Sequence, residues 1–323
     1  MTQRKITLVP SFIKQNLVLV GIVALIVVTS IVQPKFLSSA NLTNVMRQLW
    51  PLPFVALGMT FVIIGGFIDL SVVGIISLCS VITMYMINPL GQVGAMLLGI
   101  LAGAVLGYLN GFILTTFGAQ IQAEVLFITY GMSSIYMAVG LLFTNAETMR
   151  IERSLKPYGI FTELGSGTIF GIIPTVLVVF LALLVLMHLF HTRTLVGRSI
   201  SLMGGNREAA FLSGFNVKNG MRLVYTISGI MSAMGAISLV ARTTIASATI
   251  GVGYETTAIL CVVVGGTTLK GGKGSVLRTM FGVVLITLLG NCMNMLNLST
   301  YMQTVMRGAV LVVAIWLDNR REL

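Results

Sequence analysis

Residues 52–88 read "LPFVALGMTFVIIGGFIDLSVVGIISLCSVITMYMIN", and Asp69 is the only charged residue among them. The apolar runs on either side of Gly65-Gly66, at about 50–66 and 71–88, approach the roughly 18–20 residues with which a helix crosses a bilayer. Glycine pairs beside polar residues indicate an interrupted helix, because glycine tolerates backbone conformations that end a helix. The stretch therefore predicts two membrane helices joined by a break.

The rest of the chain has the same character. Of its 323 residues, 56% are hydrophobic and only 9% are charged, whereas about 25% are charged in soluble domains. A soluble protein of this length needs more polar surface than this. We therefore predict an all-α polytopic membrane protein that forms one transmembrane domain over residues 1–323.

Ten apolar segments are candidates for membrane helices. The run at 17–32 is long for a signal peptide, so we expect it to be retained as the first helix. The segment 255–266 is too short to cross alone and must be extended or broken. The ten candidates lie at about 17–32, 50–66, 71–88, 93–117, 124–144, 170–190, 222–244, 255–266, 277–297 and 301–317.

The basic residues predict the orientation. With the N-terminus inside and ten spans, 13 of the 20 Lys and Arg residues lie on the cytoplasmic side, and Arg242 and Arg307 fall within or at the ends of spans. This excess predicts that both termini are cytoplasmic, with a cytoplasmic loop at about 192–222 and an external loop at about 145–169. The net charge of +11 does not come from a basic patch interleaved with aromatic residues, so nucleic acid is not an expected partner. The five outer basic residues are Lys35, Arg47, Arg150, Arg153 and Lys156.

The loop "GGNREAAFLSGFNVKNGMR" (204–222) interrupts two apolar segments with charged residues. Asn206 is a good N-cap, Glu208 suits the first helical turn, and Gly214 can provide the left-handed stop. These residues predict a helix of about two turns at roughly 207–213. Because so short a helix is unstable alone, it needs support from the membrane surface, from a partner or from the loop itself.

The sequence indicates no chemistry of its own. The stretch "KGGKGS" (270–275) lacks the G-x-x-x-x-G-K-[ST] spacing that cradles phosphate, so we expect no nucleotide site on this chain. It has no arrangement typical of a catalytic nucleophile, a carboxylate pair or a metal site. We therefore expect neither an enzyme nor a bound metal or cofactor.

Polar residues within apolar spans are candidates for a translocation path. Asp69, Glu124 and Glu255 stand near helix starts, where a carboxylate can cap the free N–H groups. Arg307 lies inside an apolar segment and needs a partner or water. The asparagines could equally form hydrogen bonds between helices. An ion-coupled secondary transporter and a membrane scaffold stay open as alternatives. The path candidates are Asp69, Ser71, Asn110, Asn291, Asn294 and Arg307.

Six blocks in order, covering about 36–319, resemble the membrane permeases of bacterial ABC importers for sugars, of the ribose and galactose type. The resemblance implies a ten-helix subunit of the bacterial inner membrane that pairs with a second permease, in a homodimer or heterodimer. It also implies two cytoplasmic ATPases that carry ATP and Mg, and an external solute-binding protein. The blocks are "FLSSANLTNVMRQ" (36–48), "ALGMTFVIIGGFIDLSV" (56–72), "GYLNGFIL" (107–114), "GRSISLMGGNREAAFLSGFNVK" (197–218), "YETTAILCVVVGGTTLKGGKGSV" (254–276) and "MRGAVLVVAIWLD" (306–318).

The resemblance also implies that the short helix of the cytoplasmic loop couples the permease to the ATPase during alternating access. The sequence departs from the family pattern where helices break or begin: Phe67 and Val73 replace glycines, and Glu124 is unusual. The substrate therefore stays open between a sugar, a polyol and a nucleoside. The implied coupling residues are Asn206, Arg207, Glu208, Ala209, Ala210, Ser213 and Gly214.

Overall fold

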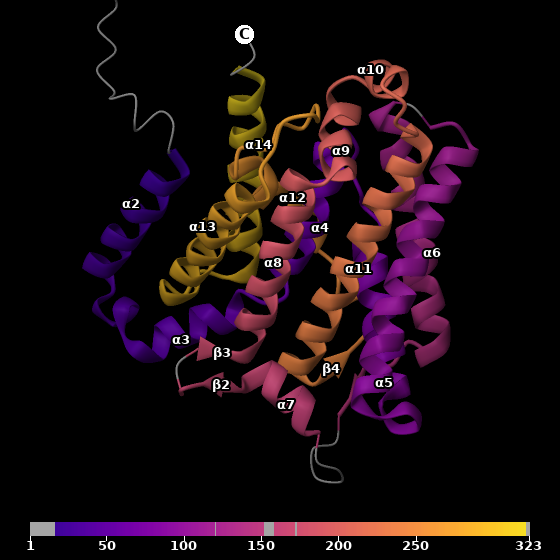
Figure 1. Ribbon diagram of the computed structural model, residues 1–323. Helices are drawn as coiled ribbons and strands as arrows, with labels where there is room; N and C mark the ends of the chain where they lie inside the picture. Colours follow the sequence, from indigo (N-terminus) through magenta and orange to yellow (C-terminus); the bar gives the residue numbers. More distant parts are fainter. Residues whose placement is uncertain (1–16, 120, 152–157, 172, 321–323) are drawn as a thin grey trace, which may run out of the picture.

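The computed structural model describes residues 17–119, 121–151, 158–171 and 173–320, and these form one bundle of helices (Figure 1). The helices are α2 (Leu17–Val32), η1 (Pro34–Leu37), α3 (Ser39–Gln48), α4 (Leu52–Ile64), α5 (Val72–Thr116), α6 (Gln122–Thr144), α7 (Gly159–Ser166), α8 (Thr175–Arg193), α9 (Leu195–Gly205), α10 (Arg207–Leu212), α11 (Val217–Thr243), α12 (Tyr254–Val264), α13 (Val276–Met295) and α14 (Thr300–Arg320). The strands are β1 (Met149–Arg150), β2 (Thr168–Ile169), β3 (Ile173–Pro174) and β4 (Ile245–Ala246).

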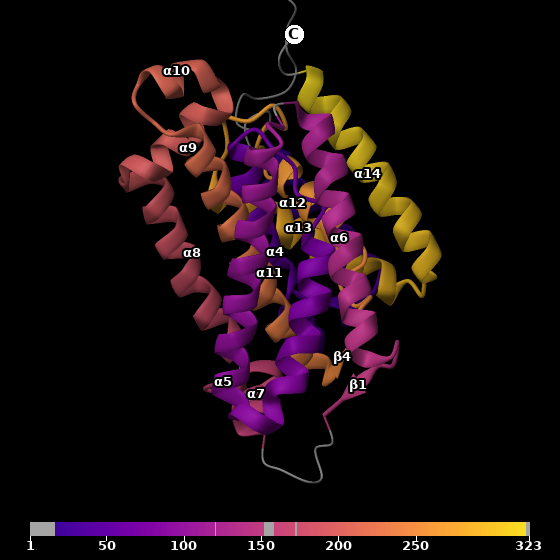
Figure 2. The same cartoon turned by 90° about the vertical axis from the view of Figure 1, so that its right-hand side faces the viewer.

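The short strands form two antiparallel pairs, β1 with β4 and β2 with β3. Both pairs lie with α3 and α7 at one end of the bundle, whereas α10 lies at the other end (Figures 1 and 2). The predicted helical class is thus confirmed, and the two ends of the bundle are built differently.

The helices occupy the predicted segments, with five differences. The helix α3 lies outside every predicted span, and α11 begins at Val217, earlier than the predicted start at 222. The helix expected from 170 begins at Thr175, because Ile173 and Pro174 pair with β2. The predicted loop at about 145–169 contains β1, α7 and β2, and its residues 152–157 lie outside the described residues. The helix α9 was not predicted.

Five of the described helices are long and apolar enough to cross a membrane by themselves: α5, α6, α8, α11 and α13. The pair α3 and α4, which is bent by 42°, adds a sixth crossing if it forms one span. The apolar helices α2, α12 and α14 are shorter in their described parts. The architecture is that of a polytopic membrane protein.

The 45-residue α5 is a hairpin of two helices. Its backbone leaves the helical conformation at Gly91, where φ is 71° and ψ is 172°, two residues after Pro89. A Cβ atom on Gly99 would collide with the Thr83 side chain, so the two halves run back past each other. These halves correspond to the two spans predicted at 71–88 and 93–117.

The second half of α5 packs on α11 through glycines spaced four residues apart. A Cβ atom on Gly103 would lie 2.5 Å from the carbonyl oxygen of Gly229, and one on Gly111 would lie 2.6 Å from Cα of Arg222. Between them, Gly107 meets the backbone of Tyr225 in the same way. Small residues at this spacing allow two membrane helices to pack backbone to backbone. The pair is therefore held too closely for a side chain at any of these three glycine positions.

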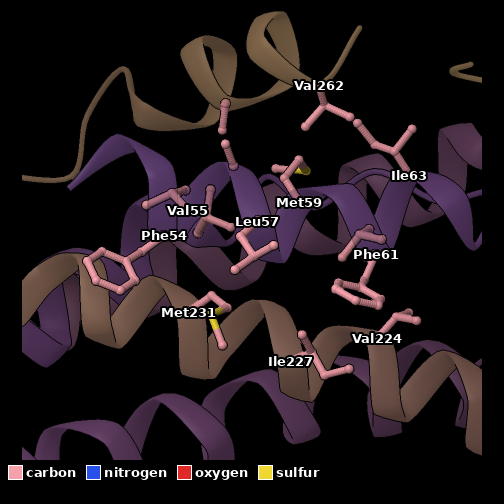
Figure 3. Close-up of a cluster of buried hydrophobic side chains, with 14 of the residues drawn as sticks. Phe54, Val55, Leu57, Met59, Phe61, Ile63, Val224, Ile227, Met231 and Val262 are labelled. Atoms are coloured by element: carbon pink, nitrogen blue, oxygen red, sulfur yellow. The ribbon is translucent and has the colours of Figure 1, made fainter. Parts of the chain in front are cut away.

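The core is centred on α4, of which every residue is buried. Figure 3 shows Leu57 and Phe61 of α4 facing Ile227 and Met231 of α11, with Val262 of α12 on the opposite side. A helix that is apolar all round fits this central position, because each of its faces is covered by protein. The break that follows α4 is therefore held within the bundle.

Candidate functional site

The helix α10 protrudes from one end of the bundle as a short capped turn (Figure 2). The Asn206 side chain accepts a hydrogen bond of 2.9 Å from the Ala209 N–H, and Gly214 has a φ of 86°. The predicted cap, stop and helix are confirmed, with the C-terminal end one residue earlier at Leu212. Phe211 and Leu212 are 69% and 78% exposed, respectively. We call Glu208, Phe211 and Leu212 the coupling surface.

The unpredicted α9 supports α10 from below. The Thr194 hydroxyl caps α9 by accepting the Gly197 N–H at 2.9 Å, and Asn206 ends α9 and begins α10. After α10, the Phe215 N–H donates to the Ala210 carbonyl oxygen at 3.0 Å. The threonine cap was the signal in the sequence that could have revealed α9. The seven predicted coupling residues thus lie together, in a turn clamped between two helices.

Arg207 links α10 to the break after α4. Its guanidinium lies 4.6 Å from the ring centre of Phe67, which is a cation–π contact. Partial burial lowers the pKa of Arg207, but a guanidinium remains charged at neutral pH. The first residue of α10 therefore touches the segment between α4 and α5 directly.

The helices α4 and α12 are each followed by a Gly-Gly pair, Gly65-Gly66 and Gly265-Gly266, and they end in the same way. Gly66 and Gly266 have φ values of 83° and 90°. Their N–H groups donate to Ile63 and Val263, at 2.9 and 2.8 Å. In each case the next N–H reaches back five residues, at 3.1 Å for Phe67 and 3.2 Å for Thr267. This is the hydrogen-bond pattern of a Schellman ending, which requires the left-handed conformation.

Both breaks meet the end of α9 in one cluster, which we call the glycine node and define as Gly66, Gly204, Gly271 and Gly272. A Cβ atom on Gly204 would lie 2.7 Å from the Gly272 nitrogen and would collide with the Ile64 carbonyl oxygen. One on Gly271 would lie 2.6 Å from Cα of Gly66. Three segments far apart in the sequence thus touch through their backbones, directly behind α10.

Asp69, Ser71 and Asn110 form one buried hydrogen-bond network. The Asp69 carboxylate accepts the Ser71 N–H at 2.9 Å, the Ser71 hydroxyl, and the Ser228 hydroxyl at 2.8 Å. The Asn110 amide donates to the Ser71 hydroxyl at 2.6 Å and accepts from the Tyr136 hydroxyl at 2.7 Å. Sequence reasoning did not identify Ser228 and Tyr136, which carry no local signal. The network ties the α4–α5 break to α5, α6 and α11 and is fully enclosed by protein.

The remaining path candidates lie apart from this network. Asn291 and Asn41 exchange two amide hydrogen bonds of 3.1 Å, and Asn294 accepts one of 2.8 Å from the Gln303 amide. Both asparagines therefore connect helices, which was the alternative left open. Asn294 and Arg307 also line a cavity of about 290 Å³ between α3, α4, α12, α13 and α14, which we call the α12–α14 cavity.

The two glutamates at helix starts cap those helices. The Glu124 carboxylate accepts the Ile121 N–H at 3.3 Å, and the Glu255 carboxylate accepts the Gly253 N–H at 2.9 Å. Together with the bond from Ser71 to Asp69, these contacts confirm the capping interpretation.

Comparison with known proteins extends over almost the whole fold. Residues 41–315 match a family described as "Branched-chain amino acid transport system / permease component". The chain is 35% identical to the ribose import permease protein of Bacillus subtilis over 302 residues, which cover 93% of this chain and 91% of the relative. It is 30% identical to the D-allose transport system permease protein of Escherichia coli over 291 residues, or 88% and 85% of the two chains. It is also 30% identical to the L-arabinose transport system permease protein of Escherichia coli over 308 residues, or 94% and 90%.

Proposed function

This chain belongs to the branched-chain amino acid transport system permease family, and we propose that it is the transmembrane subunit of an ATP-driven importer for a sugar. Its relatives are named as permeases for ribose, D-allose and L-arabinose, which favours a sugar over a polyol or a nucleoside. The protein is a multi-pass protein of the bacterial inner membrane. Its role as a transport subunit without chemistry of its own fits the permease names of these relatives.

In the proposed topology the chain crosses the membrane ten times and has both termini in the cytoplasm. The two halves of α5 count separately, α3 and α4 form one span, and α2, α12 and α14 complete the ten. Arg198 in α9, Lys218 at the start of α11 and Lys270, which lines a pocket with Arg207, belong to the α10 end of the bundle. Lys35 and Arg47 lie just before and within α3, at the other end, which supports a cytoplasmic α10. The predicted inner residues Arg4, Lys5 and Lys14 lie outside the described residues.

The coupling surface carries the proposal of an ATPase partner. Two exposed apolar side chains on a rigid helix at the cytoplasmic end are suited to bind a groove on another protein. ATP and Mg would be bound by that partner, because the loop "KGGKGS" lacks the spacing for phosphate. A second permease subunit and an external solute-binding protein complete the proposed importer.

The glycine node and Arg207 give a physical route for the coupling. A displacement of α10 moves Gly204, which touches the end of α4 and the loop that follows α12. Packed backbone has no side-chain rotamers that could absorb the displacement. The motion is therefore passed to α5 and α13, whose rearrangement would open the path alternately to the two sides.

Uptake into proteoliposomes tests the proposed function. The chain is co-purified with its ATPase and reconstituted, and radiolabelled ribose, D-allose and L-arabinose are supplied with the binding protein. We expect uptake of at least one sugar that requires ATP and the binding protein and is insensitive to ionophores. Uptake driven by an ion gradient without any ATPase would instead identify an ion-coupled secondary transporter.

A further inference from the structure

We propose that the α12–α14 cavity is a resting site for a neutral polyhydroxylated solute, on the outer part of the path. The inference rests on the proposed function, because it concerns the solute that the importer carries. The cavity measures about 290 Å³, and the residues that line it come from five different helices or their ends. Its polar lining residues include Gln48, Tyr254, Thr257, Asn294, Gln303 and Arg307.

The position of the cavity fits a solute that enters from outside. The helix α13 begins at Val276, just after the glycine node, and Asn294 lies at its far end. Gln303 and Arg307 belong to the first turns of α14, and Gln48 precedes α4. The cavity therefore lies toward the end of the bundle opposite α10, where the binding protein would release its solute.

Arg307 is the strongest sign of a ligand. Its side chain is partly buried, and it makes no hydrogen bond or ion pair with another residue that the structure describes. A guanidinium at membrane depth is costly unless it finds an acceptor. Its N–H groups form a fixed fork, which can donate to two neighbouring hydroxyl oxygens of one solute.

The other polar groups offer both donors and acceptors. The Gln303 amide nitrogen donates to Asn294 at 2.8 Å and to the Leu298 carbonyl oxygen at 3.0 Å, which leaves the Gln303 carbonyl oxygen to accept. The Asn294 nitrogen remains to donate. The Thr257 hydroxyl donates to the Gly253 carbonyl oxygen at 2.7 Å, so its lone pairs remain to accept.

This mixture selects the class of solute. A hydroxyl group donates and accepts at once, whereas a carboxylate or phosphate oxygen only accepts. The free acceptor oxygens of Gln303 and Thr257 would lie against the oxygens of an anion. Because neither side has a proton to donate, no hydrogen bond could form, which is unfavourable. No carboxylate lines the cavity to attract a cation. A sugar satisfies both kinds of group.

Cysteine labelling tests the site in the complete reconstituted importer. Thr257→Cys places a thiol in the cavity wall, and Thr256→Cys places one on the neighbouring exposed position as a matched control. The native cysteines are buried. We expect a hydrophilic thiosulfonate reagent to label Thr257→Cys more slowly when the transported sugar is present, whereas Thr256→Cys reacts equally with and without sugar. Equal labelling of Thr257→Cys in both conditions overturns the assignment.

A second test of the site measures sugar uptake and ATPase activity in the Arg307→Leu variant. Loss of charged hydrogen bonds to the solute should lower the maximal uptake rate by about tenfold. ATPase activity stimulated by the loaded binding protein should remain, so less sugar enters per ATP. Thr304→Leu, on the same helix but outside the cavity, should transport normally. Uptake and stimulated ATPase activity that fall together in Arg307→Leu would show a structural role and overturn the site.

A wild-type importer that carries none of the three sugars would overturn the proposed function itself.

Discussion

The Gly272 N–H donates a hydrogen bond of 2.8 Å to the Ile64 carbonyl oxygen, which joins the loop after α12 to the last residue of α4. The same oxygen lies against Gly204, at the end of α9. One carbonyl group thus connects the two broken helices and the segment that carries α10. This contact makes the glycine node sensitive to the addition of a single methyl group.

Gly204→Ala should separate uptake from ATP hydrolysis. The new methyl group would collide with Ile64 and force the node apart, and such overpacking costs about 1–3 kcal/mol. We expect ATP-driven uptake to fall severely while basal ATPase activity of the assembled complex persists. Both are measured in proteoliposomes that contain equal amounts of importer.

Gly205→Ala is the matched control. A Cβ atom there would meet only Cα of Gly272, at 3.7 Å, which is an ordinary van der Waals contact. Uptake by this variant should equal that of the wild type. Equal losses in Gly204→Ala and Gly205→Ala would argue against a node that depends on backbone contact.

Ser228→Ala should destabilise the fold through Asp69. The substitution removes a hydrogen-bond partner from a buried carboxyl group, and leaving a buried polar group unsatisfied costs about 1–3 kcal/mol. We expect a lower midpoint of thermal unfolding in detergent, measured by circular dichroism.

Ser232→Ala, one turn further along α11, provides the comparison. The Ser232 hydroxyl is buried and has no hydrogen-bond partner among the described residues, so its removal should be neutral or stabilising. If both alanine variants lower the midpoint equally, the hydrogen bond from Ser228 to Asp69 adds no more stability than an unpaired buried serine does.

Leu212→Asp should weaken the association with the ATPase. A charge at the centre of an apolar contact removes a main source of binding, with a loss of affinity of about tenfold or more. Recovery of the ATPase with the tagged permease measures the effect. Phe170→Asp is the control, because Phe170 is 91% exposed but lies in the turn between β2 and β3 at the opposite end. Loss of the ATPase from both variants would exclude a binding surface confined to α10.

Thiol labelling at the two ends of the bundle tests which side of the membrane each end faces. A thiol in Ser213→Cys should react with an impermeant reagent only from the cytoplasmic side, and one in Phe170→Cys only from outside. Labelling is measured in right-side-out and inverted vesicles. Reaction of both thiols from one side would overturn the ten-span topology.

The sequence was informative where structure depends on neighbouring residues. Asn206 and Gly214 predicted α10 almost to the residue, because caps and stops act within a few positions. The break at Gly65-Gly66 was evident for the same reason, and the segment 255–266 was expected to be extended or broken because it is too short to cross the membrane alone. The glycine node was not predictable, because it depends on three segments meeting through their backbones.

The candidate path was harder to predict. Asp69, Ser71 and Asn110 were chosen as polar residues in apolar spans, and the structure brings them together. Their partner Ser228 is 159 residues from Asp69 in the sequence, and nothing in its own surroundings distinguishes it from Ser232. The packing of distant helices decides which buried serine forms a side-chain hydrogen bond. A local sequence pattern carries no information about that packing.

The seam between α5 and α11 has a consequence for communication across the membrane. The helix α11 starts five residues after α10 ends, and at its other end it leads into β4, which pairs with β1. Packed along the glycines of α5, α11 joins α10 at one end to the β1–β4 pair at the other. If the proposed ATPase docks at α10 and a solute-binding protein docks at the opposite end, any coupling between the two binding equilibria is reciprocal, so each partner changes the affinity of the other by the same factor. Two proteins that never touch would in this way sense each other through one helix.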